Sequence, residues 1–198
     1  MRAQFVISAA APEQFPAAGA PEIVFAGRSN VGKSSLINDL TGHGGLARAS
    51  KTPGRTRLIN WFAVTPKPTM PLQFVDLPGY GYAAVPLDMR ASWQPLIEAL
   101  LEGTRPIALV LVLIDMRRGL GEEEQDFLEW LAERKLASHV VLTKADKLSK
   151  SERGVVTAQL KRQLGGGVGV TAFSTLDQFG RDELWSAIFR AAKPRRAG

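Results

Sequence analysis

The sequence predicts an α/β fold with a mostly parallel sheet and helices on both faces, and three observations support this. Short apolar runs alternate with segments of helical spacing, which is the pattern of folds of this class. The run Ile107–Ile114 is continuously rich in Ile, Leu and Val, as expected of a central parallel strand covered on both faces. A glycine-rich loop joins an earlier strand to a helix. We find no repeat and no domain boundary, so the 198 residues are expected to form one domain.

The N-terminal half begins with an extension. Residues 1–20 are rich in Ala and Pro and are expected to include an edge strand at Gln4–Ser8. The apolar run Ile23–Ala26 predicts the first central strand, and Lys33–Leu40 has helical spacing. The stretch Thr41–Thr56 is rich in Gly, Ser, Thr and Pro, which indicates a loop, and its length makes it functional or mobile. The elements that follow are two strands and a second loop, at Leu58–Thr65, Leu72–Val75 and Tyr80–Pro86.

The C-terminal half alternates helices with strands. A helix predicted at Met89–Leu101 precedes the central strand. Residues Glu122–Lys135 run from acidic to basic, which is the charge order that stabilises a helix dipole. Three glycines at positions 165–167 end a helix predicted at Ser151–Leu164. The other elements are strands at Val140–Leu142 and Val168–Phe173, a helix at Asp182–Ala192 and a basic tail of residues 193–198.

The composition excludes several classes of protein. Apolar residues make up 45% of the chain and charged residues 22%, which is typical of a globular domain in water. No apolar run approaches the ~20 residues of a membrane span, and the first residues are too weakly patterned for a signal peptide. The absence of cysteine excludes disulfides and thiolate metal sites. We therefore expect a cytoplasmic protein without a membrane span, and a monomer by default.

The net charge of +6 is unevenly distributed. No Asp or Glu occurs from Thr41 to Val75. Two interpretations remain open: an ordinary solvated surface with a basic tail, or a footprint for a polyanion such as RNA. The cations concerned are Arg48, Lys51, Arg55, Arg57 and Lys67 in the acid-free stretch, and Arg190, Lys193, Arg195 and Arg196 near the C-terminus.

The glycine-rich loop fits the pattern G-x-x-x-x-G-K-[ST] between a strand and a helix, which predicts a phosphate-binding loop. Its glycines let backbone N–H groups surround an anion, and the helix N-terminus behind it favours negative charge. Lys33 is expected to reach the β- and γ-phosphates, and Ser34 to hold Mg²⁺. The alternative is a chance glycine-rich turn, which the flanking strand and helix disfavour. The loop consists of Gly27, Arg28, Ser29, Asn30, Val31, Gly32, Lys33 and Ser34.

A second motif predicts the choice of base. Thr143, Lys144, Ala145 and Asp146 directly follow a predicted strand, at the end of the sheet where ligands bind in such folds. The Asp146 carboxylate can accept two N–H groups from guanine, whereas adenine would leave it unpaired. The Lys144 stem can lie across the purine face. The alternative for Asp146 is a plain helix cap.

Three shorter motifs complete the candidate site. Asp76, Leu77, Pro78 and Gly79 follow a strand, where an Asp orients Mg²⁺ and a Gly N–H senses a γ-phosphate; alone, the pattern would indicate only a turn. A switch hydroxyl that closes on Mg²⁺ is expected from the long loop, and Thr52 and Thr56 are equal candidates. The segment Phe173, Ser174 and Thr175 either contacts the guanine carbonyl or caps the last helix.

Together these residues resemble the EngB-type GTPases of the TrmE–Era–EngA–YihA–Septin-like group of P-loop NTPases. The segments that carry the resemblance are Gly27–Ser35, Ser50–Thr56, Asp76–Ala83, Thr143–Asp146 and Phe173–Ser174, and among them the strings Gly-Tyr-Gly-Tyr-Ala and Thr-Pro-Gly-x-Thr are specific to this family. The resemblance implies a three-layer P-loop NTPase fold of the Ras-like G-domain type. It also implies bacterial ribosome assembly and septation as the setting.

Several assignments come from the resemblance alone. It implies that Thr56, with Ser34, ligates Mg²⁺ and that Phe173–Thr175 bind guanine. It places the segment Gly54, Arg55, Thr56, Arg57 and Leu58 against the nucleotide. The family usually has Gln after the switch threonine, whereas Arg57 here adds a positive charge near the phosphates or a partner.

Hydrolysis is expected to be slow. Ras-like proteins orient the attacking water with a Gln directly after the D-x-x-G glycine, and Tyr80 stands there in this chain. In relatives with an Asn at the position of Asn30, K⁺ can occupy the place of an arginine finger. Arg55 or Arg57 acting in cis is the competing explanation. The catalytic candidates are thus Lys33, Thr56 and Asn30.

Two functions from different classes follow. The first is a GTPase switch that docks on the assembling large ribosomal subunit through rRNA. The second is a septation-linked switch that binds another protein without a direct role at the ribosome. A weaker third is a GTP/GDP sensor without meaningful hydrolysis. Binding to rRNA should weaken steeply with salt, whereas binding to an apolar protein surface should not.

Overall fold

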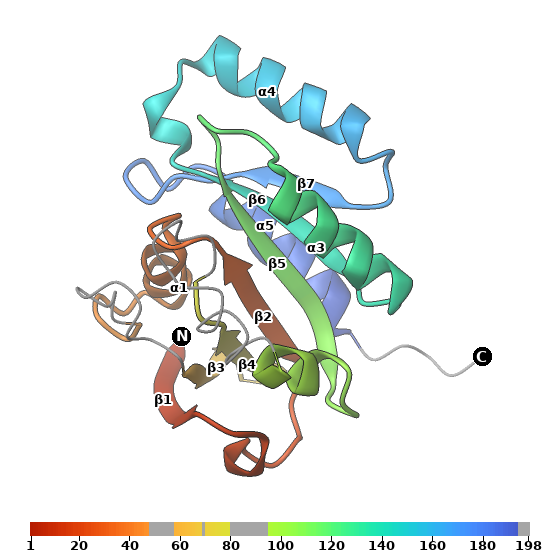
Figure 1. Ribbon diagram of the computed structural model, residues 1–198. Helices are drawn as coiled ribbons and strands as arrows, with labels where there is room; N and C mark the ends of the chain where they lie inside the picture. The colour runs from red at the N-terminus through yellow and green to blue at the C-terminus, as the bar shows by residue number, and fades with distance from the viewer. Residues whose placement is uncertain (48–57, 69, 80–94, 194–198) are drawn as a thin grey trace.

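The computed structural model describes residues 1–47, 58–68, 70–79 and 95–193 (Figure 1). Seven strands in the described residues form one sheet in the order β1-β3-β4-β2-β5-β6-β7. The strands are β1 Arg2–Ala9, β2 Glu22–Gly27, β3 Ile59–Lys67, β4 Met70–Asp76, β5 Ile107–Asp115, β6 Ser138–Thr143 and β7 Gly169–Ala172. The helices are α1 Lys33–Thr41, α3 Glu122–Glu133, α4 Lys150–Gln163 and α5 Arg181–Ala192, with short 3₁₀ turns η1 Pro12–Gln14 and η2 Ala145–Lys147 and a helical segment at 95–101.

The sheet is mostly parallel, as predicted. Strand β2 pairs in parallel with both β4 and β5, and β5, β6 and β7 continue the parallel ladder. Strand β1 pairs antiparallel with β3, which confirms the predicted edge strand, and β3 pairs antiparallel with β4. The chain leaves β2 toward one side of the sheet and returns to β5 on its other side. The carboxyl end of β2 is therefore a topological switch point, where folds of this class bind ligands.

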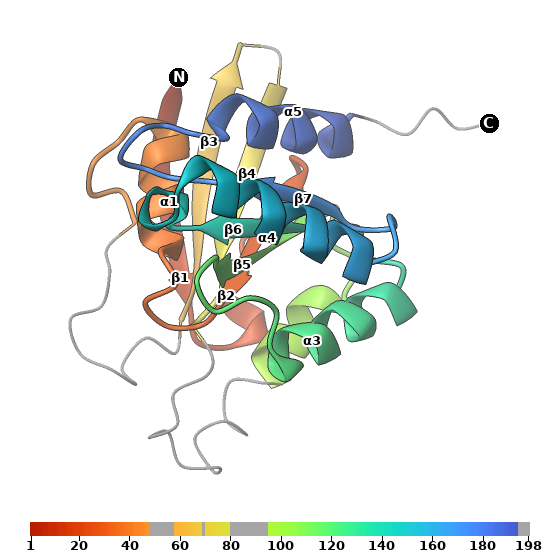
Figure 2. The same ribbon diagram turned by 90° about the horizontal axis from the view of Figure 1, so that it is seen from above.

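Both faces of the sheet are covered (Figure 2). Alternate residues of each strand face opposite sides, so β2 gives Val24 and Ala26 to one apolar cluster and Ile23 and Phe25 to the other. The first cluster includes buried residues of segment 95–101, α3 and α4, and the second includes buried residues of α1 and α5. The three-layer architecture is thereby confirmed.

The predicted end of one helix was wrong by two residues. Helix α3 ends at Glu133, not at Lys135, and Lys135 has a left-handed backbone with φ of 57°. The N–H of Lys135 donates to the carbonyl of Ala132, and the N–H of Leu136 donates to that of Leu131, so the helix closes in a tight terminal turn. The basic residues that were expected in the last turn lie directly after it.

A buried ion pair ties the N-terminal extension to the sheet. Glu22, at the start of β2, is fully buried, and both of its oxygens accept hydrogen bonds from Arg105 Nε, at 3.1 and 3.0 Å. Arg105 also donates to the carbonyl of Pro16 at 3.0 Å and lies over the rings of Phe15 and Trp61. The extension is thus held at the end of the sheet away from the carboxyl edge.

Replacing Arg105 with methionine is expected to lower the free energy of unfolding by about 3 kcal/mol, because Glu22 would stay buried without its counter-charge. Urea unfolding of the full chain measures this. The double variant Glu22→Gln/Arg105→Met should recover most of the loss, since it leaves no buried charge. Equal stability of the wild type and the single variant would contradict this explanation.

His139 at the start of β6 is largely buried and neutral. Its Nε2 lies 2.9 Å from Thr171 Oγ1, and the ring packs so closely on Gly169 that a Cβ there would come within 2.3 Å of Nδ1. Burial, and then the charges of Arg190 and Lys161, lower the pKa of His139 from 6.5 to about 4.

The wild type is therefore expected to lose stability as pH falls from 6.5 toward 4. In that window the unfolded chain binds a proton at His139 and the folded chain does not, which costs up to about 3 kcal/mol. Unfolding free energies measured across this range for the wild type and for His139→Gln isolate the effect, because the variant lacks this titration. Parallel pH profiles for the two proteins would contradict it.

Candidate functional site

The phosphate-binding loop lies at the carboxyl end of β2, as predicted. Gly27 ends the strand, and a Cβ at this position would lie 3.0 Å from both Leu113 and Val31. Gly32 has φ of 109°, which favours glycine, and it caps the N-terminus of α1. The loop therefore holds its backbone against the helix N-terminus, in the arrangement that binds phosphate.

Lys33 begins α1 and forms an ion pair with Asp76 at the end of β4. Both side chains are nearly buried. The structure thus brings together the phosphate-binding lysine and the D-x-x-G aspartate, which are 43 positions apart. An anion that enters the loop would compete with Asp76 for the ammonium group.

Gly79 packs against the same loop. A Cβ there would approach Ser29 Oγ to 2.8 Å and the Ser29 backbone to 3.1 Å, so any larger residue would displace the loop. Leu77, between Asp76 and Gly79, is buried, and its N–H donates to the Phe25 carbonyl at 3.0 Å. The segment Asp76–Gly79 therefore lies beside the loop where a γ-phosphate sensor is required.

The second motif is connected directly to the first. Thr143 Oγ1 donates to the Val31 carbonyl at 2.7 Å, and Lys144 Nζ donates to the Asn30 carbonyl at 2.8 Å. Asn30 and Lys144 both have left-handed backbones, with φ of 61° and 59°. Lys144 also pairs with Asp115 at 3.0 Å, so its stem is stretched between the loop and β5.

Asp115 at the end of β5 anchors this connection. Arg117 Nε donates to its Oδ1 at 2.9 Å, and a second guanidinium nitrogen lies 2.7 Å from its Oδ2. These hydrogen bonds, with a further contribution from Lys144, hold the pKa of Asp115 well below its ordinary value. Asp115 is therefore ionised at any pH at which the protein works.

Asp146 lies in η2 and is fixed by its neighbours. Ser174 Oγ donates to Asp146 Oδ1 at 3.1 Å, and Lys147 Nζ lies 3.1 Å from Oδ2. Burial alone would raise the pKa of Asp146, but the hydrogen bonds from Lys147 and Ser174 outweigh it, and the net pKa lies below the ordinary value. The carboxylate is thus an ionised acceptor, as guanine recognition requires.

The last segment joins the site through the backbone. The Ala145 N–H donates to the Phe173 carbonyl at 3.1 Å, and Ser174 is buried beside Asp146, whereas Thr175 is exposed. Helix α5 begins only at Arg181, so Phe173–Thr175 do not cap it. Of the two interpretations of this segment, the cap is therefore wrong.

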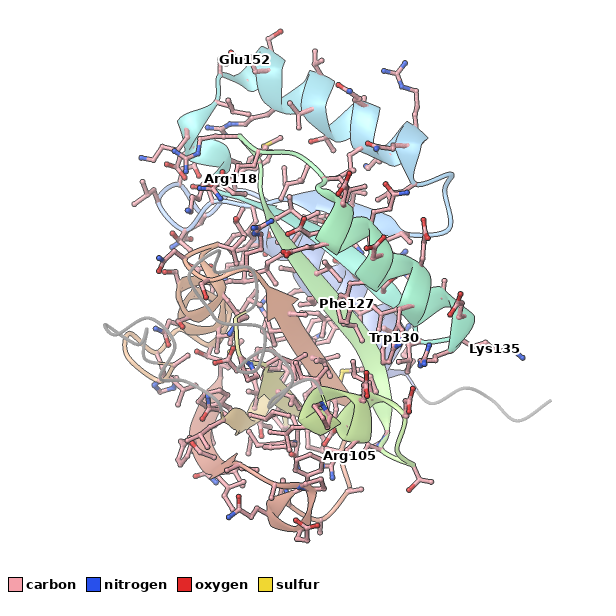
Figure 3. The ribbon with its side chains drawn as sticks, viewed as in Figure 1. Arg105, Arg118, Phe127, Trp130, Lys135 and Glu152 are labelled. Carbon is pink, nitrogen blue, oxygen red and sulfur yellow. The ribbon has the colours of Figure 1, made fainter. Side chains whose placement is uncertain are left out.

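A hollow of about 280 Å³, to which several charged residues contribute, lies beside the phosphate-binding loop. It is bounded by the loop, by the end of β5 with the turn that follows, and by Glu124 of α3. Arg28 reaches from the loop to Glu123 at 3.3 Å. Figure 3 shows Arg118 in this region, at the opposite end of β5 from Arg105.

Some predicted site residues lie outside the described residues: Thr52, Gly54, Arg55, Thr56, Arg57 and Tyr80. Leu58, the first described residue after this segment, is half-buried. The switch hydroxyl and the role of Arg57 therefore remain predictions.

Asp115 and Arg117 are site residues that the sequence motifs did not include. One signal was available, since Asp115 directly follows the buried run Ile107–Ile114 and so stands at the carboxyl end of a central strand. A charged residue at this place faces the ligand-binding edge.

The oxygen donors near the loop fit a magnesium ion that is shared with phosphates. The Ser34 hydroxyl lies in the first turn of α1, and the Asp76 carboxylate pairs with Lys33, the residue before Ser34. Hydroxyl, carboxylate and phosphate oxygens are the ligands that Mg²⁺ prefers. In the described ranges no group of three or more His, Cys, Asp and Glu could hold a metal ion, and a phosphate-shared Mg²⁺ does not require one.

Comparison with known proteins agrees with this geometry. Residues 22–144 match a family model described as "50S ribosome-binding GTPase". The chain is 48% identical over 188 residues to a "Probable GTP-binding protein EngB" of Geobacter metallireducens, covering 94% of this chain and 90% of that protein. It is 47% identical to the protein of the same description from Trichlorobacter lovleyi, covering 93% and 92%.

Solved structures confirm the fold. The crystal structure of a probable GTP-binding protein engB superposes with a TM-score of 0.69 at 24% identity, covering 88% of this chain and all of that one. At this identity the likeness is informative about the fold alone. None of the helices in the described part of the chain has the length and hydropathy of a membrane span.

Proposed function

We propose that this chain, which belongs to the EngB family of GTP-binding proteins, is a slow GTPase switch in assembly of the large ribosomal subunit. Normal cell division and septation would depend on it through this role. The observation that carries the proposal is the joining of the phosphate loop and the guanine motif by Lys144, which contacts Asn30 and Asp115. The description of the matching family as ribosome-binding supports the choice of partner.

Each part of the site has a role toward GTP. The loop amides and Lys33 would neutralise the β- and γ-phosphates, and Asp146 would accept both N–H groups of guanine. Phe173–Thr175 would close the base site, since Ser174 already orients Asp146. Gly54–Leu58 would contact the nucleotide from the switch.

Ser34 and Thr56 would hold Mg²⁺, and Asp76 would orient it through water. When bound, the ion would offset the negative charge of the β- and γ-phosphates. Lys33 would have to exchange Asp76 for phosphate as the nucleotide enters. Gly79 would report the γ-phosphate to the segment that follows it, and its close packing on Ser29 supports this role.

Hydrolysis of GTP requires that a water molecule be positioned and that developing charge be stabilised. Lys33 and the loop amides supply charge stabilisation, but Tyr80 offers no amide to orient the water. The intrinsic rate is therefore expected to be low, and a partner would complete the site. Such a protein works as a switch rather than as a metabolic enzyme.

Replacing Asn30 with alanine tests whether K⁺ assists hydrolysis. If the Asn30 side chain helps to hold K⁺ beside the phosphates, the wild type should hydrolyse GTP severalfold faster in KCl than in NaCl, and Asn30→Ala should lose this difference. Steady-state phosphate release in the two salts measures it. An unchanged ratio in the variant would exclude the role and favour Arg55 or Arg57 acting in cis.

Co-sedimentation with ribosomal subunits tests the proposed partner. Wild-type protein is incubated with isolated large or small subunits in the presence of a non-hydrolysable GTP analogue, GDP or no nucleotide, at two salt concentrations. We expect binding to the large subunit with the analogue, and weaker binding at the higher salt because phosphate contacts release counterions. No binding in any nucleotide state would overturn the ribosome role and favour a protein partner at the septum.

A further inference from the structure

The end of the sheet opposite the nucleotide site carries an unusual distribution of charge. Helices α3 and α4 on one face and α5 on the other run back along the parallel strands, so all three end toward the end of the sheet that is away from the phosphate-binding loop (Figures 1 and 2). Figure 3 shows Lys135 at the end of α3 and Glu152 at the opposite end of the neighbouring α4.

Two stretches of chain without acids meet at this end. No Asp or Glu occurs in residues 153–176, which contain most of α4 and all of β7, or in residues 184–198, which contain most of α5. We name as the basic pole the five cations that these stretches and the end of β3 place there: Lys67, Lys161, Arg162, Arg190 and Lys193.

The cations of the basic pole are available to a partner. Lys161, Arg162, Arg190 and Lys193 are exposed, and no carboxylate within the described ranges forms an ion pair with them. Other described arginines behave differently: Arg105 and Arg134, at the same end of the sheet, and Arg117, at the other end, each pair with a carboxylate.

The positive groups surround one end of the sheet. Lys161 and Arg190 lie on helices that cover opposite faces of the sheet, and after burial the charges of both lower the pKa of His139 at the start of β6. Lys67 Nζ lies 4.7 Å above the ring of Phe189, which precedes Arg190 in α5. Glycines 165–167, after α4, have open space where side chains would be, so a bulky anion can approach the backbone.

We propose that the basic pole binds the phosphate backbone of RNA and that it does so in every nucleotide state. This rests on the proposed function, because rRNA is the polyanion that a ribosome-binding protein meets. Exposed cations without a carboxylate partner suit contacts with phosphates rather than stacking on bases. Such contacts position a protein on RNA without reading its sequence. The pole lies at the amino ends of the parallel strands, far from the groups that a γ-phosphate would move, so GTP should not control it.

A pair of charge-matched variants tests the proposal. Lys161→Gln/Arg190→Gln removes two cations from the pole, and Lys150→Gln/Arg153→Gln removes one lysine and one arginine from the start of α4, at the other end of the sheet. Binding of the full-length proteins to a short blunt RNA duplex is measured with GDP and with a GTP analogue, over a series of salt concentrations.

The pole variant should bind the duplex at least about tenfold more weakly than the wild type, with the slope of log affinity against log salt reduced by about 2. The control should match the wild type, and both nucleotides should give the same result. Equal loss in the two variants would overturn the proposal, as would binding to anionic lipid vesicles but not to RNA.

His139 provides a second readout inside the pole. Phosphates bound to Lys161 and Arg190 should raise the pH at which the His139 imidazole titrates, followed by NMR in a His43→Gln background that leaves a single histidine. The pole variant should not respond to RNA. An imidazole that titrates at the same pH with and without saturating duplex in the wild type would also overturn the proposal.

The two proposals can fail separately. Suppose that the wild type binds large subunits only with the GTP analogue, and that the pole variant binds them in the same way with the same salt dependence. The proposed RNA contact of the basic pole is then overturned and the ribosome role stands. If the wild type binds no subunit but the duplex binds through the pole, the ribosome role is overturned and the RNA contact stands.

Discussion

Replacing Asp146 with asparagine is expected to weaken GTP and GDP binding by about a thousandfold or more. The carboxylate is held by Lys147 and Ser174 as an ionised acceptor for two guanine N–H groups. An asparagine amide would present an N–H₂ donor where an acceptor is required. A guanine N–H donor would then face another donor in a buried place, which is unfavourable. Xanthine has a carbonyl in place of the guanine amino group, so the same variant should gain affinity for xanthosine nucleotides.

Titration calorimetry with GDP and xanthosine diphosphate measures both effects. Asp177→Asn is the matched control, because Asp177 is an exposed carboxylate of the neighbouring loop that pairs with Arg153 at 3.4 Å. The control should bind GDP like the wild type and should not bind the xanthosine nucleotide. GDP affinity that is unchanged in Asp146→Asn would mean that another group selects the base.

Replacing Lys33 with methionine is expected to reduce GTP turnover by about two to three orders of magnitude. The ammonium group is the charged donor that α1 places at the phosphate loop, and methionine keeps the stem but loses the charge. Single-turnover hydrolysis, followed by phosphate release, measures the chemical step apart from binding.

The same substitution should destabilise the nucleotide-free protein, because Asp76 would lose its partner while nearly buried. Thermal unfolding with and without GDP therefore accompanies the kinetics. Lys150→Met, on the exposed first turn of α4, is the control and should change neither quantity. Turnover within a factor of two of the wild type would exclude Lys33 from transition-state stabilisation.

The local parts of the site could be predicted because each is encoded in a short stretch. The phosphate loop needs Gly32 at φ of 109° and a helix directly after it, and both requirements are visible as glycine spacing and helical periodicity. The guanine motif follows a strand that is recognisable by its apolar residues. For the same reason most strand and helix positions were predicted to within about two residues.

The connections between the motifs could not be predicted, because they depend on the order of the strands. Lys144 reaches Asn30 and Asp115 only because β5 lies between β2 and β6. Glu22 and Arg105 are 83 positions apart and meet because β2 and β5 are neighbours. No local pattern specifies such pairings.

Charge could be counted from the sequence, but its place on the surface could not be predicted. The acid-free stretch from Thr41 to Val75 was open to two interpretations, a solvated surface or a polyanion footprint, and residues 48–57 of it lie outside the described residues. The cations of α4 and α5 belong to helices on opposite faces of the sheet, and they come to the same end of it only because both helices run back along the parallel strands.

Co-sedimentation of Asp146→Asn with large ribosomal subunits is the sharpest test of a switch controlled by the nucleotide site, because the variant should respond to a nucleotide that native GTPases ignore. The variant is incubated with a non-hydrolysable analogue of either xanthosine or guanosine triphosphate. We expect the xanthosine analogue to bring down more of the variant than the guanosine analogue does, above the nucleotide-independent binding through the basic pole. Equal sedimentation with both analogues would contradict a switch controlled from this site.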